Sequence, residues 1–253
     1  KLREPESWTA ARDRAREDDA QPTGRIGELF SSTYLRNTVI GVTLATIGLV
    51  TFWGGHIYGK NALMRKAQTE VLNMENVAPD ADKKVKAETF EKYKSKIKRA
   101  EMTSMTLNTI GAGLGLVFFG GISNRIGRKG AFVLYHTMAF VMMLVLFKGL
   151  IATDASKVAL MVCLPIFGFF TVGMHAGYAV YFPELYPTRL RGTGTGFCFN
   201  MGRLGTAAAF FGFAAMASPP TPETKAMWLA PLFLLGVVVV LFAKETKDLE
   251  LPE

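Results

Sequence analysis

Long uncharged stretches alternate with short polar segments along most of the chain. Six stretches each contain about 18 residues or more, and at about 1.5 Å of helix rise per residue each can cross a hydrocarbon core about 30 Å thick. A soluble helical bundle would show a polar residue every third or fourth position, which these stretches lack. The pattern predicts an all-α fold, a polytopic membrane bundle of six transmembrane helices. The stretches are 37–59, 102–124, 130–147, 158–183, 204–222 (or from Gly192, if Arg203 is tolerated) and 226–243.

Composition and charge agree with this pattern. Hydrophobic residues make up 49% of the 253 residues, yet the chain also carries 29 Lys+Arg and 21 Asp+Glu. Only two acids, Asp154 and Glu184, lie between Met102 and Pro222. The net charge of +8 would suit nucleic acid, but the basic residues lie in loops and tails and not on one face. We expect a lipid bilayer as the partner, no nucleic acid, and an integral protein of a plasma or inner membrane.

Basic residues in short loops predict the orientation, because such loops stay preferentially in the cytoplasm. With a cytoplasmic N-terminus, the segment 1–36 and the loops at 125–129 and 189–191 lie inside, together with the tail 244–247. The opposite short loops hold only Lys148, Lys157 and Lys225. Both termini are therefore expected in the cytoplasm. Residues 1–35 would form a cytoplasmic polar segment, and residues 36–253 the transmembrane domain.

The loop after the first stretch, residues 60–101, is charged and too long for the charge rule to apply. Leu63, Ala67 and Val71 recur at helical spacing, and a second such stripe runs from Phe90 to Ala100. This spacing predicts two short amphipathic helices in an extracytoplasmic insertion. The insertion is either a solvated helical hairpin or an element that binds a partner or takes part in gating.

Three segments carry a family resemblance. Residues 120–129, Gly-Gly-Ile-Ser-Asn-Arg-Ile-Gly-Arg-Lys, resemble the G-x-x-x-D-R-x-G-R-(R/K) signature of the major facilitator superfamily, with Asn124 in place of its Asp. Residues 183–194, Pro-Glu-Leu-Tyr-Pro-Thr-Arg-Leu-Arg-Gly-Thr-Gly, are similar to the P-E-x-(F/Y)-P-T-x-x-R-G-x-G segment of its sugar and organic-ion branches, which include metabolite:proton symporters. The tail 244–250 is similar to the P-E-T-K…L-E close of those branches.

The resemblance implies that this chain is the carboxyl-terminal six-helix half of a twelve-helix transporter. An amino-terminal six-helix half, in the same chain or a separate one, would then be its partner, and Lys1 would be an internal boundary.

By the same resemblance, the first two motifs form a cytoplasmic gate. A glycine such as Gly120 allows two helices to approach, and the cations can bind carboxylates and helix ends. Asn124 keeps a hydrogen-bond acceptor but supplies no negative charge. The alternatives are a simple positive-inside turn and a local pairing of Glu184 with Arg189 and Arg191. The gate candidates are Gly120, Asn124, Arg125, Gly127, Arg128, Lys129, Glu184, Arg189 and Arg191.

Four polar residues lie deep in the predicted helices. Arg203 follows Gly192 by about 17 Å of helix, and a charge at that depth costs at least about 2.5–3.5 kcal/mol unless it faces a cavity or a partner. Asn200 shares its face, and His175, followed by Tyr178, reaches a similar depth from another helix. We interpret Arg203, Asn200, His175 and Tyr178 as candidate substrate-binding residues. His175 could carry a proton or simply form a buried hydrogen bond, and Arg203 could be a structural clamp.

Together these features predict secondary active transport of a small polar solute, a sugar or an organic anion, by alternating access and coupled to protons. The rival interpretation is a non-transporting membrane anchor that recruits a partner through residues 60–101. No enzyme, metal or cofactor is expected, because the sequence has no Ser/His/Asp, metal-ligand or P-loop arrangement. Cys163 and Cys198 lie inside apolar stretches and are expected to pack there.

Overall fold

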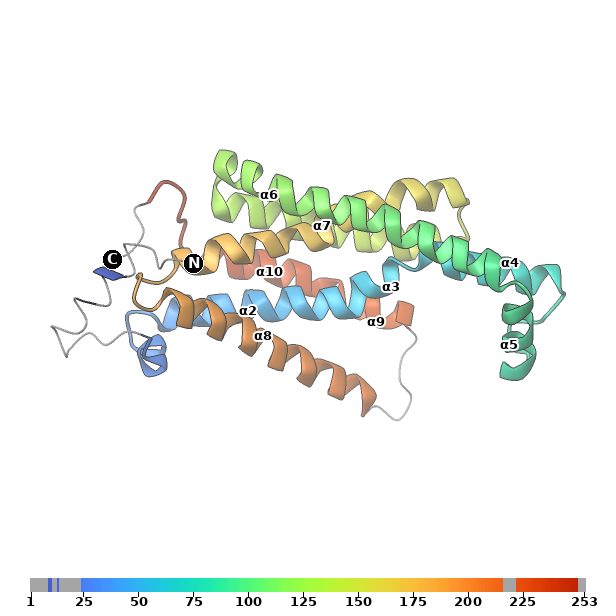
Figure 1. Ribbon diagram of the computed structural model, residues 1–253, viewed down its shortest axis with the longest axis horizontal. Coiled ribbons are helices and arrows are strands. Elements are labelled where there is room, and N and C mark those ends of the chain that lie inside the picture. The colour runs from blue at the N-terminus through green and yellow to red at the C-terminus, as the bar shows by residue number, and fades with distance from the viewer. Residues whose placement is uncertain (1–8, 11–12, 14–23, 216–221, 250–253) are drawn as a thin grey trace.

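The structure, a computed structural model, describes residues 9–10, 13, 24–215 and 222–249. Every regular element in these ranges is helical, and the long helices lie side by side in one elongated bundle (Figure 1). The predicted all-α fold class is confirmed. The predicted polar segment 1–35 lies largely outside the described residues.

The helices follow the predicted stretches closely. Four helical segments are long and apolar enough to cross a membrane, namely Leu35–Met74, Lys94–Ile151, Lys157–Glu184 and Glu223–Phe242. The elements in chain order are the 3-10 turn η1 (Ile26–Phe30), α2 (Leu35–Thr51), the π-helical η2 (Phe52–His56), α3 (Ile57–Gly59), α4 (Ala62–Met74), α5 (Lys83–Lys92), α6 (Lys94–Leu144), the π-helical η3 (Val145–Ile151), α7 (Lys157–Glu184), α8 (Arg191–Ala214), α9 (Pro222–Leu229) and α10 (Pro231–Phe242).

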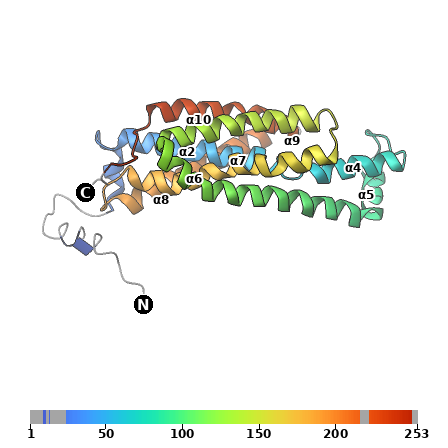
Figure 2. The same ribbon diagram turned by 90° about the horizontal axis from the view of Figure 1, so that it is seen from above.

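Helix α6 turns back on itself at Gly127, where φ is 86° and ψ is 164°. The Tyr135 hydroxyl donates to the Gly115 carbonyl at 2.9 Å, although 20 residues of straight helix would separate them by about 30 Å. The helix therefore consists of an outgoing arm, residues 94–126, and a return arm, residues 128–144, which run in opposite directions (Figure 2). These arms correspond to the second and third predicted stretches.

The fifth predicted stretch differs most from its prediction. Its helix, α8, begins at Arg191 and contains Arg203, so the earlier of the two expected starts is the one found. Its described part ends at Ala214, and residues 216–221 lie outside the described ranges. This helix is not among the four that are apolar enough to cross a membrane, because glycines, threonines and Arg203 lower its hydropathy.

Small residues let α6 and α7 come into backbone contact. A Cβ atom added at Gly111 or Gly115 would overlap the carbonyl of Pro165 or Phe169, respectively. Close backbone contact of this kind drives association where lipid supplies no hydrophobic force. Around this contact the core is aromatic, and Cys163 and Cys198 are buried and unbridged within it.

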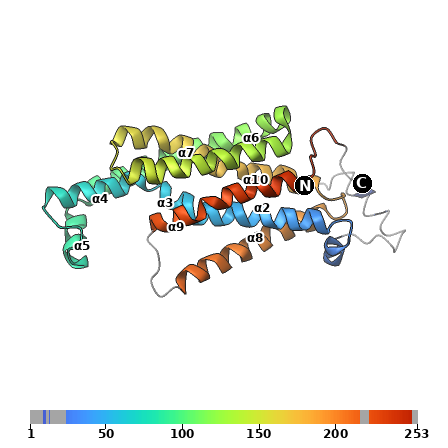
Figure 3. The same ribbon diagram turned by 180° about the vertical axis from the view of Figure 1, so that it is seen from behind.

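The segment 60–101 forms α4, α5 and the start of α6, and it projects from the end of the bundle opposite Gly127 (Figures 1 and 3). Leu63, Ala67 and Val71 are buried on one face of α4, as their spacing predicts. Asp82 caps α5 by accepting the Lys84 backbone N–H at 2.8 Å. The first expected helix is α4, whereas the expected stripe from Phe90 to Ala100 is divided at Tyr93 between α5 and the start of α6.

Candidate functional site

An ion pair joins two of the sequence motifs at one end of the bundle. Arg128 begins the return arm of α6, and Glu184 is the last residue of α7. The Arg128 Nη2 atom donates to Glu184 Oε1 at 2.9 Å, and Nε donates to Oε2 at 3.1 Å. Both side chains are mostly buried, with exposed fractions of 14% and 15%. A bidentate ion pair of this kind is stronger and more directional than a neutral hydrogen bond.

Asn124, which replaces the signature's aspartate, takes part in the same cluster. The Arg128 Nη1 atom donates to Asn124 Oδ1 at 2.7 Å and to Ser123 Oγ at 3.2 Å. The negative charge that Asn124 lacks is supplied by Glu184, which belongs to another helix. The amide therefore keeps the acceptor role, and the ion pair forms between α6 and α7.

A second carboxylate, Glu245, holds the turn between the two arms of α6. Its oxygens accept the backbone N–H groups of Arg128 at 2.9 Å, Lys129 at 3.1 Å, and Thr246 and Lys247 at 3.0 Å each. Two of these donors belong to the first turn of the return arm, where N–H groups lack helical partners. Burial raises the pKa of Glu245, but the four N–H donors outweigh this effect, and its pKa lies below the ordinary value.

Gly127 is required at this turn for two reasons. Its φ of 86° lies in the region that favours glycine, and a Cβ atom there would come 2.6 Å from the Glu245 carboxylate. Any side chain at this position would strain the turn and push Glu245 away.

The tail after α10 completes the cluster. The Thr246 hydroxyl donates to Glu184 Oε2 at 2.6 Å, and the Tyr181 hydroxyl donates to the Lys244 carbonyl at 2.7 Å. Three segments far apart in sequence are thus joined at one end of the bundle. We call this cluster the Arg128 latch; its members are Ser123, Asn124, Arg128, Glu184, Glu245 and Thr246.

The predicted local pairing of Glu184 with Arg189 and Arg191 is wrong. Arg189 instead makes a two-pronged ion pair with Glu28 of η1, and the Arg191 Nε atom donates to the Pro183 carbonyl at 3.1 Å. Glu184 is unavailable to them because its oxygens already accept from Arg128 and Thr246. Arg189 therefore secures the segment that leads into α2, outside the latch.

The remaining gate candidates have smaller roles in the described structure. The Lys129 Nζ atom donates to the Leu241 carbonyl at 2.9 Å, and the Arg125 carbonyl accepts from Lys247 Nζ at 3.2 Å. A Cβ atom at Gly120 would meet nothing within 4 Å in this chain, so the expected close approach at Gly120 stays a prediction. The close approaches occur at Gly115 and Gly111, earlier in the outgoing arm, where it crosses α7.

Glu245 and Thr246 were not candidates from the sequence. Both lie in the tail 244–250 that carries the third motif, so the resemblance marked the segment without indicating what its side chains do.

Arg203 and Asn200 lie together on an exposed face of α8. The Arg203 Nη1 atom donates to Asn200 Oδ1 at 3.1 Å, and Asn200 Nδ2 donates to the Gly196 carbonyl at 2.8 Å. The opposite face of the helix packs against α2 through residues spaced four apart. The pair predicted from sequence is therefore present, and no other described side chain hydrogen-bonds to it. The buried residues of α8 are Gly194, Cys198, Gly202 and Thr206.

His175 and Tyr178 form a second group inside the bundle. Their rings meet edge to face at 5.4 Å, and His175 Nδ1 lies 3.0 Å from the Val172 carbonyl. His175 Nε2 and the Tyr178 hydroxyl are buried and have no hydrogen-bond partner in the described part of the chain. The hydroxyl lies against Gly48 of α2, where there is no room for a side chain.

His56 and Phe52 belong to the same group and were not identified from sequence. They lie in the π-helical turn η2, and the Phe52 ring contacts those of His56 at 5.2 Å and His175 at 5.5 Å. His56 Nδ1 lies 2.8 Å from Thr171 Oγ1. His175 was selected because it is a histidine inside an apolar stretch. The same property would have selected His56, which lies in the stretch 37–59.

The two groups do not form the single patch expected from sequence. Among the described residues no hydrogen bond or ring contact joins His175 to Arg203. The link between them is Phe199, which precedes Asn200 and whose ring lies 6.1 Å from that of Tyr178. The separation arises because α8 turns Asn200 and Arg203 to its exposed face while Phe199 faces α7.

A family comparison covers most of the chain. Residues 96–253, which contain the Arg128 latch and α8, match the family described as "Sugar (and other) transporter". The chain belongs to this family of sugar and other transporters. Membership confirms the predicted relation to the major facilitator superfamily, and with the apolar helices it identifies an integral membrane protein.

Three curated relatives of this transporter-family chain are named for transport and not for an enzymatic reaction. The sialic acid transporter NanX of Escherichia coli is 34% identical over 107 residues, 42% of this chain and 26% of its own length. The cis,cis-muconate transport protein of Acinetobacter baylyi is 32% identical over 154 residues, 59% of this chain and 35% of its own length. A putative metabolite transport protein of Haemophilus influenzae is 30% identical over 131 residues, which are 51% of this chain and 30% of its own length. The chain thus spans about a third of these relatives.

Proposed function

We propose that the protein moves a small polar solute, most favourably an organic anion, across a membrane by alternating access. This chain supplies the carboxyl-terminal six-helix half. The observation that carries the proposal is the exposed Arg203–Asn200 pair on a helix of a transporter-family bundle. Two relatives are named for organic acids, sialic acid and cis,cis-muconate, and an arginine matches the charge of a carboxylate.

The exposed face of α8 is the part of the proposed solute path that this chain contributes. A guanidinium at membrane depth is costly unless water, a solute or a partner satisfies it, and among the described side chains the neutral Asn200 is the one that does so. In the proposed assembly an amino-terminal six-helix half faces α8, and the solute binds between the two halves near the midplane.

His175 and Tyr178 form the inner wall of this path in the proposal. Their unpartnered Nε2 and hydroxyl groups are available for a solute hydroxyl, a water or a proton. His175 is thus the proposed proton carrier for coupling. The alternative is that both groups only pack the interface between α2 and α7.

The proposed role of the Arg128 latch is to stabilise one of the two conformations of the transporter, open to one side of the membrane. It joins α6, α7 and the tail, so these segments move together as long as the ion pair is intact. The excess of basic residues in short loops supports a cytoplasmic position for the latch and both termini, with residues 60–101 on the opposite side.

The proposal is tested by thiol protection in the full-length protein. Cys163 and Cys198 are replaced by serine or alanine, and Asn200→Cys is introduced and treated with a water-soluble thiol reagent. A transported organic acid should slow the labelling of this cysteine. A matched cysteine at Thr69, exposed on α4, should label at the same rate with or without solute.

Equal labelling of the Asn200 position with every sugar and organic acid tried, together with absence of uptake, would contradict the proposal. The anchor interpretation would then be preferred, and deletion of residues 75–92 would be expected to release a bound partner.

A further inference from the structure

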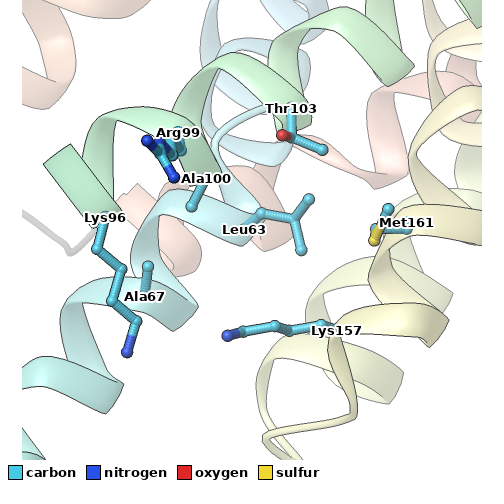
Figure 4. A pocket seen from close by; sticks show the side chains of 8 residues that line it. All are labelled: Leu63, Ala67, Lys96, Arg99, Ala100, Thr103, Lys157 and Met161. Atoms are coloured by element: carbon cyan, nitrogen blue, oxygen red, sulfur yellow. The ribbon is translucent and has the colours of Figure 1, made fainter.

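A cavity of about 300 Å³ lies at the end of the bundle opposite the Arg128 latch. Three elements line it, namely α4, the start of the outgoing arm of α6 and the start of α7 (Figure 4). Its walls combine aliphatic and cationic side chains. The lining includes Leu63, Ala67, Lys96, Arg99, Ala100, Lys157 and Met161.

The charges on this cavity are not balanced within the described chain. Lys157 and Lys96 share one carboxylate, Glu70, whose Oε2 lies 2.8 Å and 3.6 Å from their Nζ atoms. Arg99 makes no hydrogen bond or ion pair with any described residue, and it also borders a neighbouring hollow of about 460 Å³. Three cations thus face one carboxylate, and the guanidinium is the one left for an anion.

The apolar part of the cavity continues into an exposed apolar surface of α7. Leu63 and Ala67 are buried and form its floor, whereas Met161 is exposed. Beyond Met161, the large hydrophobic side chains that α7 exposes are Val162 and Ile166, and α7 carries no charge between Lys157 and Glu184. The cavity therefore lies where a charged surface meets an apolar one, the level of the membrane interface.

We propose that this cavity binds the headgroup of an anionic phospholipid. The phosphate contacts Arg99 and the two lysines, and an acyl chain follows Met161 along α7. Guanidinium and ammonium groups at an interfacial pocket attract anionic lipids, and a guanidinium can contact two phosphate oxygens at once. A lipid fits better than a transported solute because α8, which carries Arg203, contributes nothing to the cavity.

The test is a lipid titration of the purified full-length protein in detergent, with the thermal unfolding midpoint as the readout. Short-chain phosphatidylglycerol should raise the midpoint in a saturable way, and phosphatidylcholine should not. Arg99→Gln should raise the half-saturating concentration about fivefold, the effect of one basic residue near an anionic lipid. Lys94→Gln is the matched control, because Lys94 lies in the same helix but pairs with Glu91 outside the cavity.

A second variant tests the shape of the cavity independently of its charge. Ala100→Trp fills the cavity and leaves all three cations in place, and it should also abolish the effect of phosphatidylglycerol. The midpoint without lipid shows whether either variant is folded, so a general loss of stability is recognised directly.

Three results would overturn the proposal. Lys94→Gln could weaken the lipid effect as much as Arg99→Gln, which would indicate general surface charge. Phosphatidylcholine could stabilise equally well, which would exclude recognition of the anion. Inorganic phosphate alone could produce the same saturable shift and compete with lipid, which would indicate a site for a free anion. Transport is not measured, so the outcome is independent of the proposed function.

Discussion

The latch end of the bundle and the exposed face of α8 each present an arginine, but only the first of these two arginines pairs with a carboxylate among the described residues. Arg128 is mostly buried and bound by Glu184, Asn124 and Ser123. Arg203 is exposed and has the neutral Asn200 as its described side-chain partner. A satisfied charge stabilises this chain, whereas an unsatisfied one at membrane depth indicates a ligand or a surface outside it.

The largest expected effect is on the latch. Arg128→Gln leaves Glu184 mostly buried without its cation, and we expect a loss of about 3–5 kcal/mol in unfolding free energy, by analogy with broken buried pairs. The measurement is thermal or denaturant unfolding of the full-length protein in detergent. Arg125→Gln, which removes an exposed arginine from the same loop, should change stability by less than about 0.5 kcal/mol.

A double variant checks that the pair itself is responsible. Arg128→Gln with Glu184→Gln should cost less than the sum of the two single changes, because the second change removes the orphaned charge. Additive losses would show that the two residues do not interact, and the contrast with Arg203 would no longer hold.

Arg203 should show the reverse behaviour, affecting transport and not stability. Arg203→Gln removes a charged contact to a bound anion, worth about 1.5–3 kcal/mol, so we expect uptake of an organic acid to fall roughly tenfold to a hundredfold. The unfolding midpoint should stay unchanged, and Arg203→Lys should restore part of the uptake. Normal uptake combined with a lowered midpoint would instead identify Arg203 as a structural clamp.

Gly127 tests how much the backbone turn contributes to the stability of the Arg128 latch. Gly127→Ala forces a side chain into a positive-φ turn and against Glu245, and should cost roughly 1–3 kcal/mol. Gly120→Ala in the same motif is the control, because its Cβ meets open space in this chain. Equal losses would mean that a surface outside this chain packs against Gly120.

The smallest expected effect is the pH dependence carried by Glu245. Its pKa in the folded state lies below the ordinary value of 4.5, because four backbone N–H donors favour the carboxylate despite its burial. Its stabilising contribution is therefore complete above about pH 4.5 and is lost as the pH falls through the lower folded value. Unfolding midpoints of the wild type and Glu245→Gln should converge at acidic pH. A constant difference between them would show that titration of Glu245 does not contribute.

Much of the fold was predictable from sequence because the bilayer imposes a local rule. The length of an uncharged stretch determines whether a helix can span the membrane, and no knowledge of its neighbours is needed. The position of Gly127 between two such stretches likewise indicated a turn. The sequence allowed two starts for α8, because Arg203 interrupts the uncharged stretch, and the structure shows one helix that runs through Arg203 from Arg191.

The candidate site was predictable as a set of residues but not as a set of contacts. Arg128 and Glu184 were both selected, yet the sequence suggested only Arg189 and Arg191, its neighbours in the chain, as specific partners for Glu184, as one of two alternatives. Which cation reaches a carboxylate depends on how α6 and α7 pack, and those residues are 56 positions apart. Glu245 and His56 were not selected from the sequence. Glu245 acts at the turn of α6, and His56 joins a group of rings that includes His175 of α7, so both roles depend on contacts between distant segments.

The sequence by itself determined the helical membrane class, the extent of most spans and the transporter family, because hydropathy and contiguous motifs are properties of local segments. The tertiary structure alone decided that Glu184 neutralises Arg128, that Glu245 caps the return arm and that Arg203 faces away from His175. These outcomes depend on which helix faces pack together. A buried or partly buried charged side chain pairs with the partner that this packing brings within a few ångströms.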